Sequence, residues 1–153
     1  MKPKLLVSAC LLGTPCRYDG KSKKNEAVCA LAERFELIPV CPEVLGGLPT
    51  PRTPSERRGA CVVRKDGRDV TAEYRRGAEC ALGTARREGV LAAVLKERSP
   101  SCGSGEIYDG TFTGALTAGD GVTAELLKSN GITVYGEGEQ SLTEFLCSVS
   151  HST

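Results

Sequence analysis

The sequence predicts an α/β domain in which a mostly parallel, four-stranded sheet lies between two layers of helices. Three observations support this fold class. Short apolar runs alternate with helix-period segments, turn residues separate these segments, and 153 residues suffice for one well-filled core. Alternating strands and helices give a three-layer arrangement of the Rossmann or flavodoxin type, so we expect residues 1–153 to form a single domain.

The first strand–helix–strand unit occupies residues 4–41. The run KLLVSAC predicts a buried strand that ends at Cys10, and FELIPVC predicts a second strand that ends at Cys41. Between them, NEAVCALAERF repeats apolar residues at helical spacing, which predicts a helix over residues 25–35. Two strands joined through a helix should pair in parallel.

The next unit follows from residue 71 onward. TAEYRRGAECALGTARREG predicts a long helix closed by Gly89, because glycine readily adopts the left-handed conformation that ends a helix. The run VLAAVLKE then predicts the third strand.

The C-terminal part repeats the alternation once more. DGVTAELLKSNG predicts a helix with Asp120 as its N-cap and Gly131 as its C-cap, and ITVYG predicts the fourth strand. SLTEFLCSV predicts a final helix that a capping box opens, from Ser141 to Glu144.

Two segments depart from this pattern. CVVRKDGRDVT has two β-prone arms on either side of Asp66-Gly67, a favourable tight turn, so we expect a small β-hairpin insertion at about residues 60–71. The last residues, about 150–153, contain the only histidine, His151, and should form a short flexible tail.

Composition narrows the class of protein. The chain lacks the run of about 18 apolar residues that a membrane span needs, and its start lacks the apolar core of a signal peptide, so we expect a cytoplasmic protein. The net charge is +1, which disfavours a nucleic-acid partner and favours a small-molecule ligand.

Eight cysteines are the unusual feature of the composition. A reducing cytosol keeps thiols free, so metal binding or catalysis is a better explanation for them than a disulfide framework. No two of them are separated by only two residues, which excludes the zinc-ribbon, thioredoxin and bacterial-ferredoxin spacings. Their positions are Cys10, Cys16, Cys29, Cys41, Cys61, Cys80, Cys102 and Cys147.

Three of these cysteines follow the ends of predicted parallel strands. Cys10 ends the first strand, Cys41 ends the second, and Cys102 lies in the loop after the third. Ligand sites in such sheets lie outside the carboxyl ends of the strands, so these three side chains should meet there. Cys16 lies in the loop after Cys10 and is a further candidate, and a buried structural thiol remains the alternative for all four.

The other four cysteines have a simpler interpretation. Cys29, Cys80 and Cys147 fall inside predicted helices, and Cys61 opens the predicted hairpin. Cysteine at such positions usually serves as a small core residue, so we expect no chemistry from these thiols.

The loops that carry the candidate cysteines resemble a known family. VSACLLGTPCRYDG, CPEVLGGLPTPRTPSE and LKERSPSCGSGEIYDGTFTG, in this order and spacing, are similar to the signature segments of small bacterial iron–sulfur proteins that include the thiouracil desulfidases. The resemblance covers nearly the whole chain. It implies a [4Fe–4S] cluster held by three cysteines, whose open iron takes the sulfur of a thiolated pyrimidine without net redox change.

The resemblance also assigns roles to matching positions. It implies that Cys10, Cys41 and Cys102 hold the cluster, that Glu43 of the Cys-Pro-Glu turn is the catalytic acid or base, and that Ser99 of the SPSC segment is its polar partner. An open iron is a Lewis acid that prefers soft sulfur ligands, which suits the removal of sulfur from a C=S bond. The physiological substrate and the oligomeric state stay open.

Two other functions remain as alternatives. A structural or sensing module could bind zinc through Cys10, Cys16, Cys41 and Cys102, and four thiolates would close the coordination shell and prevent catalysis. A thiol-nucleophile enzyme centred on Cys102 would need a histidine partner, and the only histidine lies in the predicted tail.

Overall fold

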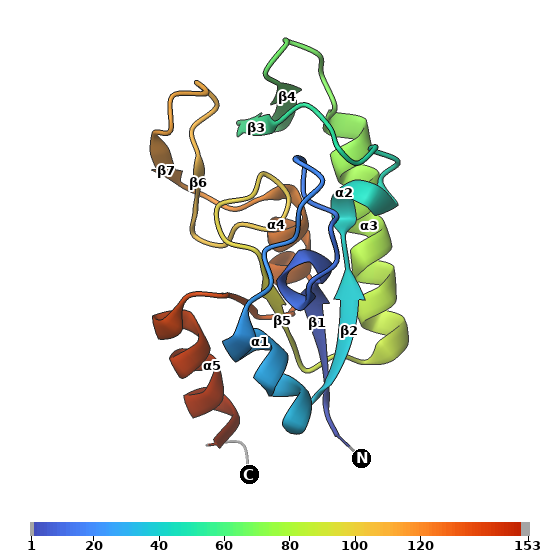
Figure 1. Cartoon of the computed structure of the whole chain (residues 1–153), viewed down its shortest axis with the longest axis vertical. Coiled ribbons are helices and arrows are strands. Elements are labelled where there is room, and N and C mark those ends of the chain that lie inside the picture. Colours follow the sequence, from blue (N-terminus) through green and yellow to red (C-terminus); the bar gives the residue numbers. More distant parts are fainter. Residues whose placement is uncertain (1, 151–153) are drawn as a thin grey trace.

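The computed structural model describes residues 2–150 and confirms the predicted α/β fold. Four parallel strands form the central sheet in the order β2-β1-β5-β8. Figure 1 shows β2, β1 and β5 next to one another. The strands are β1 (Lys4–Ser8), β2 (Glu36–Val40), β5 (Ala92–Leu95) and β8 (Val134–Gly136).

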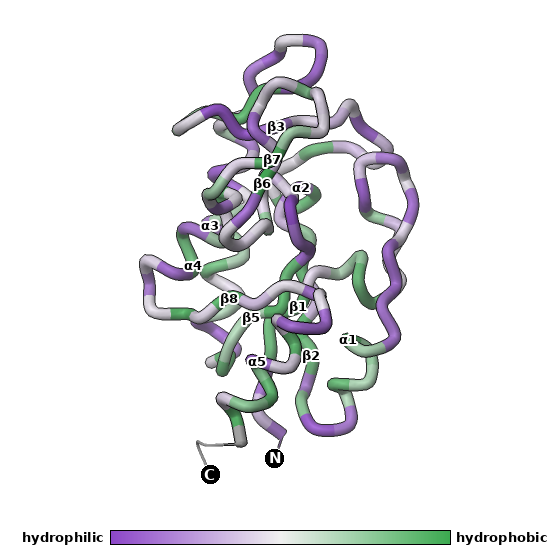
Figure 2. Tube along the Cα trace, turned by 90° about the vertical axis from the view of Figure 1, so that its left-hand side faces the viewer, coloured by the Kyte–Doolittle hydropathy of each residue, from purple (hydrophilic) through white to green (hydrophobic). Residues whose placement is uncertain are grey.

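Helices cover both faces of this sheet. Successive side chains of a strand point to opposite faces, so each strand can contribute to two cores. Leu5 and Val7 of β1 belong to one core with residues of α1 (Glu26–Ala30) and α5 (Glu139–Ser150). Leu6 belongs to a second core with residues of α3 (Thr71–Glu88) and α4 (Val122–Ser129). Figure 2 shows the hydrophobic strands at the centre of the molecule.

A short helix follows each of the first two strands of the sheet. η1 (Ala9–Leu12) directly follows β1, and α2 (Pro42–Leu45) follows β2 after the single residue Cys41. η2 (Leu31–Glu33) continues α1, so the helix predicted over residues 25–35 is an α-helical turn followed by a 3₁₀ turn.

Among residues 2–150, no helix has both the length and the apolar character that crossing a membrane requires.

Two antiparallel hairpins lie beyond the carboxyl ends of the strands (Figure 1). The first joins β3 (Ser55–Arg58) to β4 (Cys61–Arg64), so it begins earlier than the insertion predicted at about residues 60–71. A turn at Asp66-Gly67 does exist, and after it only Asp69 forms a bridge to β4. The second hairpin joins β6 (Glu106–Tyr108) to β7 (Leu116–Ala118) and was not predicted.

The predicted helix caps differ from those in the structure. Gly121, not Asp120, is the N-cap of α4, and the Asp120 carboxylate instead accepts a hydrogen bond from the N–H of Gly105. Asn130 occupies the C-cap and Gly131 follows it with a positive φ. The helix predicted to open at Ser141 begins two residues earlier, at Glu139. The Ser141 hydroxyl does not cap it and instead accepts a hydrogen bond from the N–H of Gly136. The predicted tail with His151 lies outside the described residues.

Candidate functional site

A cavity of about 520 Å³ opens at the carboxyl ends of β1, β2 and β5, where the topology predicts a ligand site. The first hairpin supplies part of its wall through residues of β3. All five residues predicted for the site line this cavity, and Cys16 does so as well. The six residues are Cys10, Cys16, Cys41, Glu43, Ser99 and Cys102.

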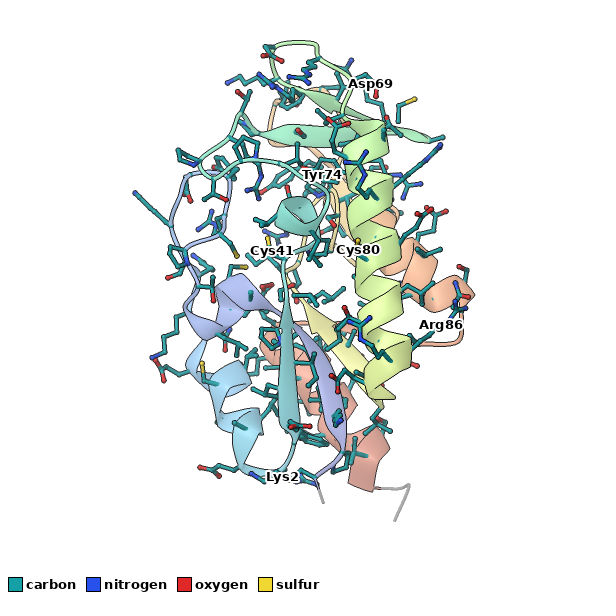
Figure 3. All side chains as sticks on the ribbon, turned by 90° about the vertical axis from the view of Figure 1, so that its right-hand side faces the viewer. Lys2, Cys41, Asp69, Tyr74, Cys80 and Arg86 are labelled. Atoms are coloured by element: carbon teal, nitrogen blue, oxygen red, sulfur yellow. The ribbon has the colours of Figure 1, made fainter. Side chains whose placement is uncertain are left out.

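Three loops bring the predicted cluster-binding cysteines together. Cys10 lies in η1, which directly follows β1. Cys41 is the N-cap residue of α2 and lies at the end of β2, as Figure 3 shows. Cys102 lies in the loop that leaves β5. Cys10 and Cys102 are buried, Cys41 is partly buried, and all three line the same cavity.

Cys16 is the fourth thiol of this cavity. Its backbone carbonyl accepts a hydrogen bond from the Cys41 thiol at 3.8 Å, and its own thiol hydrogen-bonds to those of Cys10 and Cys41. The hydrogen bond with Cys10 raises the pKa of Cys16. The hydrogen bond with Cys16, and burial, raise the pKa of Cys41 well above its usual range. The thiols of Cys16 and Cys41 therefore keep their protons at neutral pH.

Burial raises the pKa of Cys102 to about 12, and the negative charge of Glu43 contributes to this increase. The free thiol is consequently a weak nucleophile at neutral pH, since the thiolate is the reactive form. A soft metal centre that binds here displaces the thiol proton, and four thiols form a donor set for iron–sulfur or zinc chemistry.

The Glu43 carboxylate has a fixed partner on each oxygen. The Tyr74 hydroxyl donates a hydrogen bond to Oε2 at 2.5 Å, and Nη2 of Arg52 lies 3.4 Å from Oε1. The side chains of Arg52 and Glu43 are only 7% and 17% exposed, so water screens this ion pair weakly. A carboxylate on the wall of a thiol-lined cavity can exchange a proton with a molecule bound there.

Ser99 organises the loop that carries Cys102. Its side-chain oxygen accepts hydrogen bonds from the N–H groups of Ser101 and Cys102, each at 3.1 Å, and its carbonyl accepts one from Gly103 at 2.9 Å. An oxygen that accepts two hydrogen bonds keeps its own proton free to donate. Ser99 therefore has a structural task in addition to the catalytic one predicted for it.

The cavity residues fall inside a recognised sequence family. Residues 5–139 match the family model described as 2-thiouracil desulfurase. The chain belongs to the 2-thiouracil desulfurase family. This result confirms the family predicted from the three cysteine-containing segments.

Two relatives extend the comparison. A solved structure described as the [4Fe-4S]-dependent thiouracil desulfidase TudS is 52% identical to the chain. The match covers 97% of this chain and 99% of that protein, with a TM-score of 0.90. A Bacillus subtilis (strain 168) protein, described as the uncharacterized protein YbbK, is 44% identical over 145 residues, which is 88% of this chain and 96% of the relative.

The remaining cysteines of this desulfurase-family chain lie away from the cavity. Cys61, Cys80 and Cys147 are exposed, so the prediction that they pack in the core is wrong. Cys29 is partly buried and its thiol donates to the carbonyl of Leu11 at 3.7 Å. Cys80 and Cys147 lie on the solvent sides of their helices, which a position inside a helix does not by itself reveal.

Local sequence does not point to two residues that contact Glu43 in the structure. Tyr74 is an apolar-face residue of a predicted helix, and nothing in its local sequence indicates a contact with Glu43. Arg52 lies in a proline-rich loop, where an arginine side chain is usually exposed, yet its side chain is buried against Glu43. Both contacts arise from tertiary packing, so only the folded chain reveals them.

Proposed function

We propose that this chain is a thiouracil desulfidase, which hydrolyses the C=S bond of a thiolated pyrimidine to C=O and releases sulfide without net redox change. The observation that carries the proposal is a single cavity where Cys10, Cys41, Cys102 and Glu43 meet. The name of TudS, a 52% identical protein, supports both the substrate class and the cofactor. The reducing cytoplasm is the compartment we propose, because it would keep the chain's thiols reduced.

The residues of the cavity suit a [4Fe–4S] cluster held by Cys10, Cys41 and Cys102. Each ligand sulfur of such a cluster binds a different iron, so the sulfurs need not surround one point. Within residues 2–150, no group of three or more His, Cys, Asp or Glu side chains is spaced to hold a single metal ion. When bound, the cluster would supply an open iron that takes a sulfur atom and polarises the C=S bond.

The remaining space would hold the pyrimidine. The cavity of about 520 Å³ falls within the range of about 300–1,000 Å³ that is usual for small-molecule sites. The side-chain oxygen of Ser99 already accepts two hydrogen bonds, so its hydroxyl proton can donate to a ring nitrogen or carbonyl oxygen. The size of the cavity and this donor together suit a flat polar base.

Glu43 would move the protons of the reaction. Its carboxylate takes a proton from the water whose oxygen attacks the C=S carbon, and it later returns a proton to the departing sulfur or to the ring. One water is consumed, one C=S bond becomes C=O, and one hydrogen sulfide leaves. No electrons are gained or lost, so the chain needs no external reductant.

The test is anaerobic reconstitution with iron and sulfide, removal of excess sulfide, and incubation with 2-thiouracil or 4-thiouracil. We expect stoichiometric sulfide and uracil, with the new oxygen derived from isotopically labelled water and no need for an electron donor. Absence of turnover with both bases and with thiolated nucleosides would refute the assignment. A requirement for reductant would refute the non-redox mechanism alone.

A closed zinc site is the alternative, because Cys16 lines the same cavity as the three proposed ligands, although within residues 2–150 these thiols are not spaced to surround a single ion. Four thiolates on one zinc would leave no open position and would give a colourless, inactive protein. Metal analysis after anaerobic purification separates the two: the desulfidase proposal expects about four irons per chain and brown colour, whereas the alternative expects one zinc.

A further inference from the structure

Tyr74 contacts the proposed catalytic carboxylate from outside the cysteine loops. It lies on α3, is only 2% exposed, and its hydroxyl donates a hydrogen bond to Oε2 of Glu43 at 2.5 Å (Figure 3). A hydrogen bond to an ionised oxygen is stronger than one between neutral groups. The contact therefore links α3 to the carboxylate that moves protons in the proposed reaction.

The second oxygen of Glu43 faces Arg52. Nη2 of Arg52 lies 3.4 Å from Oε1, and its Nη1 donates to the carbonyl of Pro49 at 3.2 Å, which fixes the guanidinium. The terminal torsion of a glutamate side chain is broad, so an isolated carboxylate would rotate freely. With a hydrogen bond on one oxygen and an ion-pair partner beside the other, the Glu43 carboxylate is held in one orientation.

Tyr74 is suited to donate a hydrogen bond and not to act as a base. Burial raises the pKa of Tyr74 far above its usual range, and the negative charge of Glu43 adds to the effect. The phenol therefore stays protonated and cannot replace Glu43 as the base.

Close helix packing holds the two partners at this distance. Gly77 lies on α3 one turn after Tyr74, and a Cβ atom there would overlap the carbonyl oxygen of Pro42. Gly46 at the end of α2 would in the same way overlap the carbonyl oxygen of Glu73. Two glycines thus let α2 lie directly against α3, with Glu43 opposite Tyr74.

We infer that Tyr74 is a positioning residue for desulfuration, which holds the Glu43 carboxylate in the orientation that proton transfer needs. The inference rests on the proposed function, because it assumes that Glu43 moves the proton. Misorientation of a reacting group lowers the rate of the chemical step more than it weakens substrate binding. The loss of the Tyr74 hydroxyl should therefore reduce kcat and leave KM nearly unchanged.

The test compares Tyr74→Phe with Tyr135→Phe in the cluster-loaded protein. The control removes a hydroxyl that shares a 3.2 Å hydrogen bond with Ser148, and Tyr135 is not among the cavity residues. We expect Tyr74→Phe to keep its iron content, absorption spectrum and melting temperature within the range of the control. We expect kcat for 2-thiouracil to fall about tenfold and KM to change less than about threefold.

A double-mutant cycle shows whether the hydroxyl acts through Glu43. In a Glu43→Asp background the shorter side chain withdraws the carboxylate from the phenol, so Tyr74→Phe should change kcat less than about twofold. A persisting tenfold loss would overturn the inference, as would a Tyr74→Phe protein that loses its cluster or melts well below the control.

The two proposals can fail separately. Wild-type kcat in Tyr74→Phe, combined with an inactive Glu43→Gln, overturns the positioning role and leaves the desulfidase assignment intact. Full activity in Glu43→Gln overturns the acid–base role of Glu43 and the positioning role with it, because no carboxylate would then need positioning, and the desulfidase assignment again stays intact.

Discussion

The side-chain oxygen of Ser99 accepts a hydrogen bond from the backbone N–H of Cys102 at 3.1 Å. A second bond comes from the N–H of Ser101, which is fully buried. The residue proposed to assist catalysis is thus also the residue that shapes the loop of a proposed cluster ligand. Both tasks use the same oxygen, because two N–H groups occupy its lone pairs and leave the proton free.

Ser99→Ala should therefore affect the cluster as well as the rate. Two N–H groups would lose their acceptor, and we expect the free energy of unfolding to fall by about 1–2 kcal/mol. Iron content after reconstitution should fall, and kcat per bound cluster should fall about tenfold. Ser104→Ala is the matched control, since that hydroxyl lies two residues beyond Cys102 and donates only a 3.5 Å bond to Val134. Equal behaviour of the two variants would contradict the dual role.

Serine substitution at each proposed ligand should abolish the cluster. Cys10→Ser, Cys41→Ser and Cys102→Ser each remove one of three thiolates, and a three-ligand site has no spare donor. Iron analysis and visible absorption after anaerobic reconstitution measure the loss. Cys80→Ser and Cys147→Ser are the controls, because both thiols are exposed and outside the cavity.

Cys16→Ser decides whether this set of ligands is correct. Cys16 contacts the proposed ligands without being one of them, so we expect the variant to retain its iron. If Cys16→Ser loses its iron while Cys10→Ser or Cys41→Ser retains it, the assignment of ligands is wrong.

The part of the site that depends on local pattern and topology could be predicted from the sequence. Alternating apolar runs predict the parallel sheet, and the rule that sites lie at the carboxyl ends of strands brings Cys10, Cys41 and Cys102 together. The cavity bears out that convergence. The roles of these residues came from the family resemblance and stay predictions.

What the sequence could not predict depends on competition between distant groups. Ser141 has the sequence pattern of a helix cap, but its hydroxyl instead accepts a hydrogen bond from the N–H of Gly136. β3 reads SERR, a polar segment with no strand pattern, and it becomes a strand by pairing with β4. The contact between Tyr74 and Glu43 spans 31 positions of sequence and requires two glycines elsewhere.

Glu43→Gln should separate metal binding from catalysis. The amide keeps the shape of the side chain but cannot accept a proton from water, so we expect kcat to fall by about 10²-fold or more. Iron content and the absorption spectrum should match those of the wild type, because cysteines and not Glu43 hold the cluster. Glu79→Gln, on the exposed side of α3, is the control and should keep wild-type kcat.

Gly77→Ala should damage the site from outside the cavity. The new methyl group would overlap the carbonyl oxygen of Pro42 and push α2 away from α3, which we expect to cost about 1–3 kcal/mol of stability. Both Cys41 and Glu43 should shift with α2, so cluster retention and kcat should fall together. Gly83→Ala changes the same helix where no atom lies within 4 Å, and it should stabilise the protein by up to about 1 kcal/mol. Circular-dichroism melts and iron analysis of the two variants test this difference.

The ionisation of Cys102 should control how the cluster-free chain reacts with alkylating reagents. A thiol whose pKa is raised to about 12 holds its proton throughout the neutral range, so its thiolate fraction grows about tenfold for each pH unit until the pH approaches that value. We expect the alkylation rate of Cys102 by iodoacetamide, followed by peptide mass spectrometry, to rise without a plateau up to pH 9.5. A free cysteine peptide should level off above its ordinary pKa of about 8.5.

Cluster loading should abolish this alkylation at every pH tested, because a coordinated thiolate is neither free nor protonated. Loading of the cluster should accordingly release the Cys102 proton and become more favourable as the pH rises. A plateau near pH 8.5 in the cluster-free chain would show that burial does not raise the pKa of this thiol. Unchanged alkylation after loading would show instead that Cys102 is not a ligand, and the remaining thiol, Cys16, would then have to complete the set with Cys10 and Cys41.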